Sequence, residues 1–218
     1  QAFAVNTLGA HNAAMAAADA DLPLLHLSSD YVFDGNSREP YTEYHPTGVP
    51  PNQYGRSKLH AELLVREAWS QHFIVRVAAL FGLGRKNFVS WVLDQADASN
   101  PLAIVHDRFA TPTWTDDLAR QLLTLVRTPY YGTYHATGLG VTNWYYLAHS
   151  ALVLAGLDPR GVKPVPDVEL VSPAQRAAYT ALSNHLLRLR GLCTMLPWRE
   201  ALAGFIAQRA SETDGGPQ

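Results

Sequence analysis

Residues 22–35 read LPLLHLSSDYVFDG, an apolar run that ends in a short polar stretch and then in turn residues. The apolar part has the length and composition of a buried strand in a parallel sheet, and we expect that strand over residues 22–28. Ser28, Ser29 and Asp30 then fall at its carboxyl end. Ligands of open parallel sheets bind at that end of the strands, so the sequence predicts a polar site there.

A Tyr and a Lys lie four residues apart in the next expected helix, residues 53–70. Residues at i and i+4 share one helix face, so the Lys58 ammonium can lie close to the Tyr54 phenol. A nearby cation lowers the pKa of a phenol, which can then give a proton to a developing alkoxide and recover it. The Ser29 hydroxyl would polarise the carbonyl. Together these groups predict ketone reduction, with the hydride supplied by a cofactor.

Helical and strand-like segments alternate along the chain, which is typical of a parallel α/β sheet. The remaining expected elements are helices at 1–20, 86–98 and 198–209, helices that begin at Asp116 after a Thr115 cap and at Asn143, and strands at 73–80, 102–106 and 132–136. Residues 159–173 are rich in Pro and Val and predict an extended, irregular segment able to cross a substrate cleft. The polar, Gly-containing residues from Ser211 onwards predict a disordered tail.

The composition is that of a globular chain. Of its 218 residues, 47% are hydrophobic and 17% charged, which is enough apolar content for a substantial core. The 17 Lys and Arg are outnumbered by 19 Asp and Glu, and no dense basic run favours nucleic-acid binding. No apolar run reaches the ~20 residues of a membrane span and no signal peptide opens the sequence, so the cytoplasm is the expected compartment.

Other site chemistries find little support in the residues. The nine His residues include no His-x-x-x-His or His-Glu-x-x-His spacing, and His60-Ala61-Glu62 lacks the Pro-Cys-x-x-Cys partner of a deaminase zinc site. The paired serines lack the Gly-x-Ser-x-Gly context of a hydrolase nucleophile, and taken alone they suit strand-end capping as well as catalysis. Cys193 is the sole cysteine, which excludes an internal disulfide and a Cys-cluster metal site.

Several stretches, taken in order, resemble the dTDP-4-dehydrorhamnose reductase family, a sugar-nucleotide branch of the extended short-chain dehydrogenases/reductases. The resemblance covers nearly the whole chain. It is carried by Ala4-Val5-Asn6, SSDYVFDG (28–35), YGRSK (54–58), Arg76-Val77 with Leu80-Phe81-Gly82, Lys86-Asn87-Phe88, TPTWTDDLA (111–119), Gly132-Thr133-Tyr134-His135, Ala181-Leu182-Ser183-Asn184 and LPWREAL (196–202). The family implies a Rossmann-like parallel sheet with an interleaved, smaller lobe that covers the sugar.

The resemblance also implies roles for single residues. Ser29 falls at the family's catalytic Ser/Thr, Tyr54 at its acid, and Lys58 at the residue that contacts the nicotinamide ribose of NADPH or NADH. Ser29, Asp30 and Asn87 fall at or near the family's sugar contacts, although the start of a helix needs an Asn just as often. The possible pyrophosphate partners are Arg76, Arg85, Lys86, Arg108 and Arg176. No metal is implied.

The chain departs from the family at Ala79, where the family usually carries an aromatic residue against the sugar. Three explanations are open: the substrate differs, another residue such as Trp91 or Trp114 fills the space, or sugar binding is weak. The sequence does not choose among them.

A second departure lies at the start of the sequence. The strand, the Gly-rich phosphate turn and two further βα units that open a dinucleotide fold are missing, and residues 82–87 and 138–143 read as ordinary loops. We therefore expect that Gln1 is not the natural start. The chain as given should bind dinucleotide poorly, and its sheet should have an exposed edge.

The predicted organisation has three parts. Residues 1–82 form the later part of the dinucleotide-binding domain with the Ser, Tyr and Lys, residues 83–210 form mainly a substrate-binding lobe with segments that return to the sheet, and residues 211–218 form the tail. The expected partner is a nucleotide-sugar substrate, with no nucleic acid and no membrane. The oligomeric state stays open, a homodimer included.

The predicted function is the NAD(P)H-dependent reduction of the C4 ketone of a nucleotide-activated deoxysugar, as in dTDP-rhamnose biosynthesis. One alternative is a regulatory or binding subunit of the same fold, for which the missing phosphate turn and Ala79 argue. The other is a sugar-nucleotide epimerase or dehydratase, which uses the same Tyr and Lys. The sequence does not choose between NADPH and NADH, because the residues that read the 2′-phosphate follow a strand that it lacks.

Overall fold

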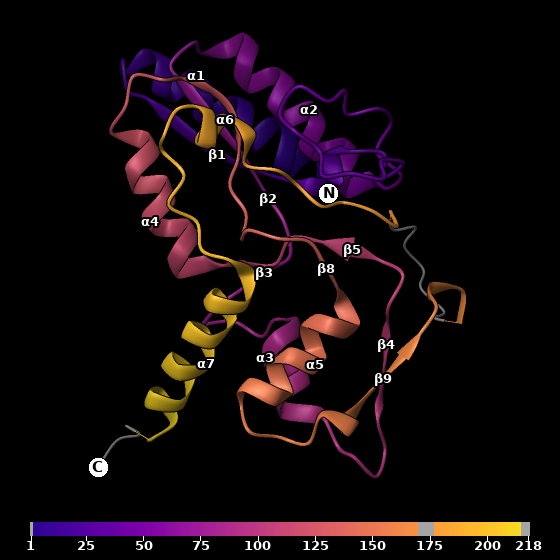
Figure 1. The fold of residues 1–218 in the computed structure, drawn as a ribbon. Coiled ribbons are helices and arrows are strands. Elements are labelled where there is room, and N and C mark those ends of the chain that lie inside the picture. Colours follow the sequence, from indigo (N-terminus) through magenta and orange to yellow (C-terminus); the bar gives the residue numbers. More distant parts are fainter. Residues whose placement is uncertain (1, 170–176, 215–218) are drawn as a thin grey trace.

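The computed structural model of the protein describes residues 2–169 and 177–214. A three-stranded parallel sheet in the order β1-β2-β7 lies at its centre (Figure 1). The strands are β1 (Leu24–Ser29), β2 (His72–Val77) and β7 (Gly132–His135). Ser29 pairs with Val77 at the last position of the β1-β2 ladder, so it lies at the carboxyl edge of the sheet. The predicted α/β fold with a parallel sheet is confirmed.

Helices cover both faces of this sheet because each presents a row of small or apolar residues to it. The helices are η1 (Phe3–Leu8), which is a π-helix, α1 (Gly9–Asp19), α2 (Gln53–Ala68), α4 (Thr115–Val126) and α6 (His185–Leu189). On one face Ala14 of α1 and Ala61 of α2 form a buried cluster with Ile74. On the other face Leu118 of α4 and Leu187 of α6 belong to a second buried cluster around the opposite side of β2.

A second lobe, in the lower half of Figure 1, contains α3, α5, α7 and a two-stranded parallel sheet. Its elements are α3 (Phe88–Gln95), β4 (Leu102–Val105), α5 (Trp144–Leu154), β9 (Val162–Val165) and α7 (Trp198–Asp214). Two short strand pairs join this lobe to the sheet: β3 (Leu80–Phe81) with β6 (Thr113–Trp114), and β5 (Phe109–Ala110) with β8 (Thr142–Asn143). The described residues also form three 3-10 turns, η2 (Asp30–Val32), η3 (Pro159–Gly161) and η4 (Asp167–Glu169). Phe81, Leu147 and Phe205 lie in its buried core.

Most predicted elements are present, with boundaries that packing explains. The predicted strand 73–80 ends early, because Ala79 has a φ of +44° that interrupts the extended backbone between β2 and β3. The predicted Thr115 cap is wrong: Thr115 is the first residue of α4, and the residue before it, Trp114, makes no side-chain cap bond. The predicted cap at Asn143 is confirmed, since its side chain accepts the Tyr146 N–H at 2.8 Å.

Two segments that the sequence predicted to be irregular contain regular structure. Within 159–173, residues Val162–Val165 form β9, because they pair in parallel with β4 of the second lobe. Residues 211–214, assigned to a disordered tail, continue α7 as far as Asp214. Residues 170–176 and 215–218 lie outside the described residues. These corrections concern the second lobe and leave the predicted site edge unchanged.

The predicted exposed sheet edge is also observed. Within the described ranges β1 pairs with β2 alone, and Leu27 in the middle of β1 is 39% exposed. None of the described helices combines the length and the apolar character that are needed to cross a bilayer.

Candidate active site

Ser29 and Tyr54 meet at the carboxyl edge of the sheet. Ser29 ends β1 and is buried, while Tyr54 lies in the first turn of α2, which begins after an Asn52 cap that accepts the Gly55 N–H at 2.9 Å. Gly55 is required there because a Cβ at this position would lie 2.0 Å from the Tyr31 carbonyl oxygen. The missing side chain lets the start of α2 approach η2 closely, which brings the phenol to the serine hydroxyl.

The Ser29 hydroxyl is the centre of this group. It donates to Asp30 Oδ1 at 2.9 Å and accepts the Tyr31 N–H at 3.2 Å. Burial raises the pKa of the Tyr54 phenol above its ordinary value, a hydrogen bond with the Ser29 hydroxyl acts against this rise, and the Asp30 carboxylate adds to it. The phenol is therefore protonated at neutral pH and can act as a proton donor.

Lys58 lies one turn along α2 from Tyr54, as predicted, but its ammonium has another partner. Its Nζ donates to the Leu27 carbonyl oxygen on the open edge of β1 at 2.9 Å. Burial lowers the pKa of Lys58, and the Glu62 carboxylate opposes that shift. Lys58 is not among the causes of the Tyr54 shift, so the prediction that it lowers the pKa of the phenol is wrong for this structure.

Asp30 is the most strongly perturbed carboxyl of the site. Burial raises its pKa to about 6, against hydrogen bonds from the Thr180 and Ser29 hydroxyls that lower it. Thr180 was not predicted from the sequence, because it comes from a distant segment without a motif that would place it here. It enters the site because its backbone N–H donates to the Phe109 carbonyl oxygen at 2.9 Å, which attaches the segment to β5.

A pocket of about 70 Å³ opens beside Asp30. It is lined by Asp30, Tyr31, Ala79, Arg108, Phe109, Trp144, Ala177 and Thr180. Ala79 contributes no ring to this pocket, and the predicted substitutes Trp91 and Trp114 do not line it: Trp91 is exposed on α3, and Trp114 is buried in the core of the second lobe. The aromatic residues that line it are Tyr31, Phe109 and Trp144, and all three lie far from Ala79 in the sequence.

Both side-chain amide atoms of Asn87 form hydrogen bonds at the start of α3. Its Oδ1 accepts the Ser90 N–H at 3.1 Å, and its Nδ2 donates to the carbonyl oxygens of Gly82 at 2.7 Å and Arg85 at 3.1 Å. The structure does not bring it to the pocket beside Asp30. Helix capping accounts for this residue, and its contact with a substrate stays a prediction.

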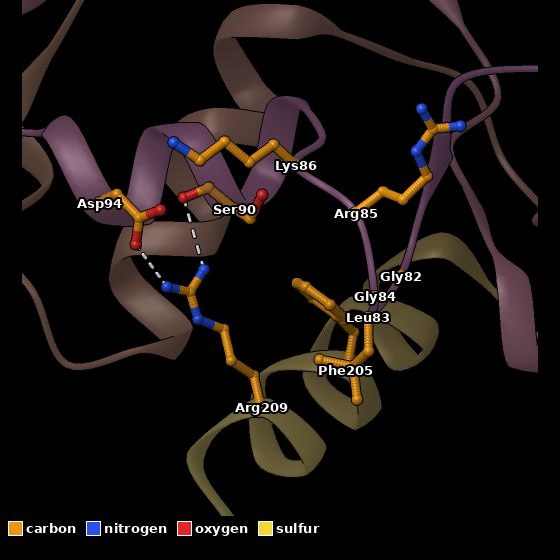
Figure 2. Close-up of a pocket in the computed structure, with 9 residues that line it drawn as sticks. All are labelled: Gly82, Leu83, Gly84, Arg85, Lys86, Ser90, Asp94, Phe205 and Arg209. Atoms are coloured by element: carbon orange, nitrogen blue, oxygen red, sulfur yellow. Dashed lines mark hydrogen bonds and ion pairs between the residues drawn. The ribbon is translucent and has the colours of Figure 1, made fainter. Parts of the chain in front are cut away.

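The predicted pyrophosphate partners that the structure describes do not converge on one place. Arg108 lines the pocket beside Asp30 and forms an ion pair with Asp167. Arg76 is tied to a buried Glu62, and Arg176 lies outside the described residues. Arg85 and Lys86 line a second pocket, of about 260 Å³, between the 82–86 loop, α3 and α7, where their side chains point in different directions (Figure 2). The guanidinium of Arg209 in that pocket is already bound to the Asp94 carboxylate. The four predicted partners that lie in the described ranges therefore form no shared phosphate site.

In the described part of the chain, no three His, Cys, Asp or Glu side chains gather in a way that could hold a metal ion.

The raised pKa of Asp30 predicts a pH-dependent stability. The folded protein binds this proton more tightly than the unfolded chain, so the stabilisation is complete below pH 3.8 and is lost as the pH rises through about 6. An amide in place of this carboxyl cannot ionise. We expect the unfolding free energy of Asp30→Asn, relative to that of the wild type, to increase by up to about 3 kcal/mol between about pH 4 and about pH 8.

Urea unfolding at both pH values measures this difference. The exposed Asp158 gives the control, because Arg160 lowers the pKa of Asp158 and Asp158→Asn should show no such increase. A stability difference between Asp30→Asn and the wild type that does not change with pH would contradict the prediction.

Comparisons with known proteins found a matching family model and several similar proteins. The family model described as the RmlD substrate binding domain matches residues 1–211. A dTDP-4-keto-6-deoxy-D-glucose reductase of Streptomyces niveus is 39% identical over 92% of this chain and 70% of its own length. Two crystal structures of dTDP-4-dehydrorhamnose reductases are also similar.

The first, from Clostridium acetobutylicum, is 35% identical with a TM-score of 0.90, and the alignment covers 95% of this chain and 73% of that one. The second, from Bacillus anthracis in complex with NADP, is 33% identical with a TM-score of 0.88 and covers 93% and 72%. The chain therefore aligns with most, but not all, of the length of these relatives.

Proposed function

The chain belongs to the dTDP-4-dehydrorhamnose reductase family, and from this premise we propose that it serves the NAD(P)H-dependent reduction of the C4 ketone of a nucleotide-activated 6-deoxysugar. The observation that carries the proposal is the meeting of the Ser29 hydroxyl and the Tyr54 phenol at the carboxyl edge of a parallel sheet, with Lys58 one helical turn away. Hydroxyl and phenol are the two groups that a developing alkoxide needs.

Each residue has a distinct role in the proposed reaction. Ser29 turns its hydroxyl from Asp30 to the substrate carbonyl oxygen and holds that oxygen by a hydrogen bond. Tyr54, kept protonated by burial, donates its proton to the same oxygen as the alkoxide forms. Asp30 accepts a hydrogen bond from the sugar and so fixes its orientation.

Lys58 and Tyr54 are the residues proposed to contact the cofactor. The Lys58 ammonium has three N–H donors, and the bond to the Leu27 carbonyl oxygen uses one of them, which leaves donors for a ribose diol. NADPH or NADH, when bound, supplies the hydride for the carbonyl carbon. A relative with 33% identity is named as a complex with NADP, which supports a nicotinamide dinucleotide in this role.

The proposal is tested by supplying the full-length protein with a dTDP-4-keto-6-deoxysugar and either reduced cofactor. We expect one molecule of cofactor to be oxidised for each molecule of sugar alcohol formed. Sugar conversion without net loss of reduced cofactor would indicate an epimerase or a dehydratase instead. No conversion, together with stoichiometric co-purification of another enzyme, would indicate a regulatory subunit.

A further inference from the structure

A short connecting segment, residues 177–184, passes beside the site and is held by its backbone from two directions. Phe109 of β5 forms two backbone hydrogen bonds with it, at 2.8 and 2.9 Å. Tyr41, in the loop between η2 and α2, forms two more, at 2.9 and 2.8 Å. Thr180 lies in this segment between the two points of attachment, so the position of its backbone is fixed.

Neighbouring side chains of the connecting segment line different pockets. The Tyr179 ring packs on the Phe109 ring, with centroids 6.0 Å apart, and lines a pocket that does not include Asp30. Thr180 is 7% exposed and lines the pocket beside Asp30. Successive side chains of an extended backbone alternate in direction, which accounts for the difference. The Thr180 hydroxyl thereby reaches the Asp30 carboxyl and forms a hydrogen bond with it.

The Asp30 carboxyl therefore has two hydroxyl partners. The Ser29 hydroxyl donates to Oδ1 at 2.9 Å, and the Thr180 hydroxyl donates to the same carboxyl group. In the proposed reaction the Ser29 hydroxyl turns to the substrate, so the bond from Thr180 is the one that remains. An ionised carboxylate accepts hydrogen bonds and donates none, which means that a hydroxyl donor favours the ionised form.

The charged and titratable groups around Asp30, among the described residues, come from three elements. Tyr31 of η2 lines the same pocket, and the Tyr54 phenol of α2 has its pKa raised by the Asp30 charge. Arg108, in the loop between β4 and β5, also lines the pocket, and its guanidinium forms an ion pair with Asp167. Its positive charge is thus already balanced by another carboxylate.

The hydrogen bond from Thr180 is the strongest influence that favours the ionised form of Asp30. Burial raises the pKa of this carboxyl to about 6, the bond from Thr180 opposes the rise most, and the bond from Ser29 follows. Removing the Thr180 hydroxyl would leave burial less opposed, and the pKa of Asp30 would rise further.

We propose that Thr180 is a positioning residue of the reduction: its hydroxyl holds the Asp30 carboxylate as the acceptor for a sugar hydroxyl while Ser29 binds the ketone oxygen. It acts through Asp30 and contacts no reacting atom. A carboxyl group at the end of β1 is thus completed by a hydroxyl that reaches it from a segment attached to β5. The assignment rests on the proposed function, because it takes Asp30 as a sugar contact.

The test is the pH dependence of kcat/KM for the ketosugar in the full-length enzyme. The wild-type value should fall as the pH drops through about 6, because protonated Asp30 is a poorer acceptor. Thr180→Val removes the hydroxyl and keeps the branched shape, and we expect this decline to move up by about one pH unit. Thr180→Ser keeps the hydroxyl and should show the wild-type decline. KM for the cofactor should stay unchanged in both variants.

Thr142→Val provides the matched control. Thr142 is 8% exposed and belongs to β8, which pairs with β5, and its hydroxyl lies 3.5 Å from the carbonyl oxygen of Asn143. Its substitution removes a buried hydroxyl at a similar depth without touching the Asp30 carboxyl. The pH at which kcat/KM declines should therefore equal that of the wild type.

Two results for Thr180→Val would overturn the assignment and leave the proposed function intact. One is wild-type kinetics, and the other is an equal loss of rate at every pH, which is what a purely structural role produces. If Thr180→Val does not fold, the wild type decides: a kcat/KM that does not decline between about pH 7 and about pH 5 would overturn the proposal. No turnover by the wild type would overturn the proposed function, and the Thr180 assignment with it.

Discussion

Tyr54→Phe is expected to lower kcat for ketosugar reduction by a factor of about 10² to 10⁴, the range that positioned general acids contribute. The phenol is the group proposed to protonate the alkoxide, and it has its hydrogen bond with the Ser29 hydroxyl before substrate arrives. Phe keeps the ring, which packs edge to face on Tyr31 with ring centroids 5.9 Å apart. The fold of the site should therefore survive the loss of the oxygen.

The measurement is the steady-state rate of reduced-cofactor oxidation together with a direct binding titration of the cofactor. Cofactor affinity should stay close to that of the wild type, because the Lys58 ammonium is anchored on the Leu27 carbonyl oxygen and not on the phenol. A Tyr54→Phe enzyme with wild-type turnover would exclude the phenol as the proton donor.

Tyr130→Phe is a matched control for this substitution. Tyr130 is 44% exposed against 45% for Tyr54, and it precedes β7, at the end of the sheet opposite to Ser29. Its ring lies beneath the guanidinium of Arg190 at 4.5 Å, a contact that Phe preserves. We expect Tyr130→Phe to leave both kcat and cofactor affinity unchanged.

The elements that local sequence patterns define were predictable. The apolar run of β1, the Asn143 cap and the i, i+4 spacing of Tyr54 and Lys58 each depend on residues close together in the chain, and the structure contains all three. By contrast, β9 was missed because a short segment with Pro164 becomes a strand only through its pairing with β4. The sequence alone carries no signal for that pairing.

Only the part of the site formed by the end of β1 and the start of α2 was predictable from the sequence. Ser29, Asp30 and Tyr54 follow one another around the end of β1 and the start of α2, so their motif places them. Trp144 and Thr180 reach the pocket from the second lobe and from a segment attached to β5. Their positions depend on tertiary packing, which no spacing along the chain expresses.

The direction of the Lys58 side chain was not predictable either, because it depends on what else attracts an ammonium. The helix period places Lys58 on the face of Tyr54, but the carbonyl oxygen of Leu27 on the open edge of β1 accepts a hydrogen bond from its ammonium. Spacing on a helix limits which groups can meet, and the competing acceptors decide which of them do.

A buried charge cluster beneath the site holds α2 against the sheet. Glu62 of α2 is fully buried and accepts hydrogen bonds from the Ser28 hydroxyl at 2.6 Å, from Arg76 Nε and Nη2 at 2.8 and 2.7 Å, and from Arg66 Nη2 at 2.9 Å. Ser28 belongs to β1 and Arg76 to β2. The cluster thus ties the helix that carries Tyr54 and Lys58 to the strand that carries Ser29.

Burial alone would raise the pKa of Glu62, but the hydrogen bonds and charge of Arg76, with help from Ser28 and Arg66, hold it below its usual range. The ionised form is therefore the one that stabilises the fold. Its contribution is present above the pKa of Glu62 in the unfolded chain and is lost as the pH falls through the lower pKa of the folded state.

Glu62→Gln is expected to lower the unfolding free energy by about 3 to 5 kcal/mol, because it leaves the Arg76 guanidinium buried without a counter-charge. Arg66→Gln removes another member of the same cluster, but the Arg66 side chain is 35% exposed and water can replace its partner, so the loss should be at most about 1 kcal/mol. Urea unfolding of both variants measures the contrast, and equal losses would contradict a special cost of the buried pair. Combining Glu62→Gln with Arg76→Met should recover part of the stability, since the double change removes the unpaired charge that the single change creates.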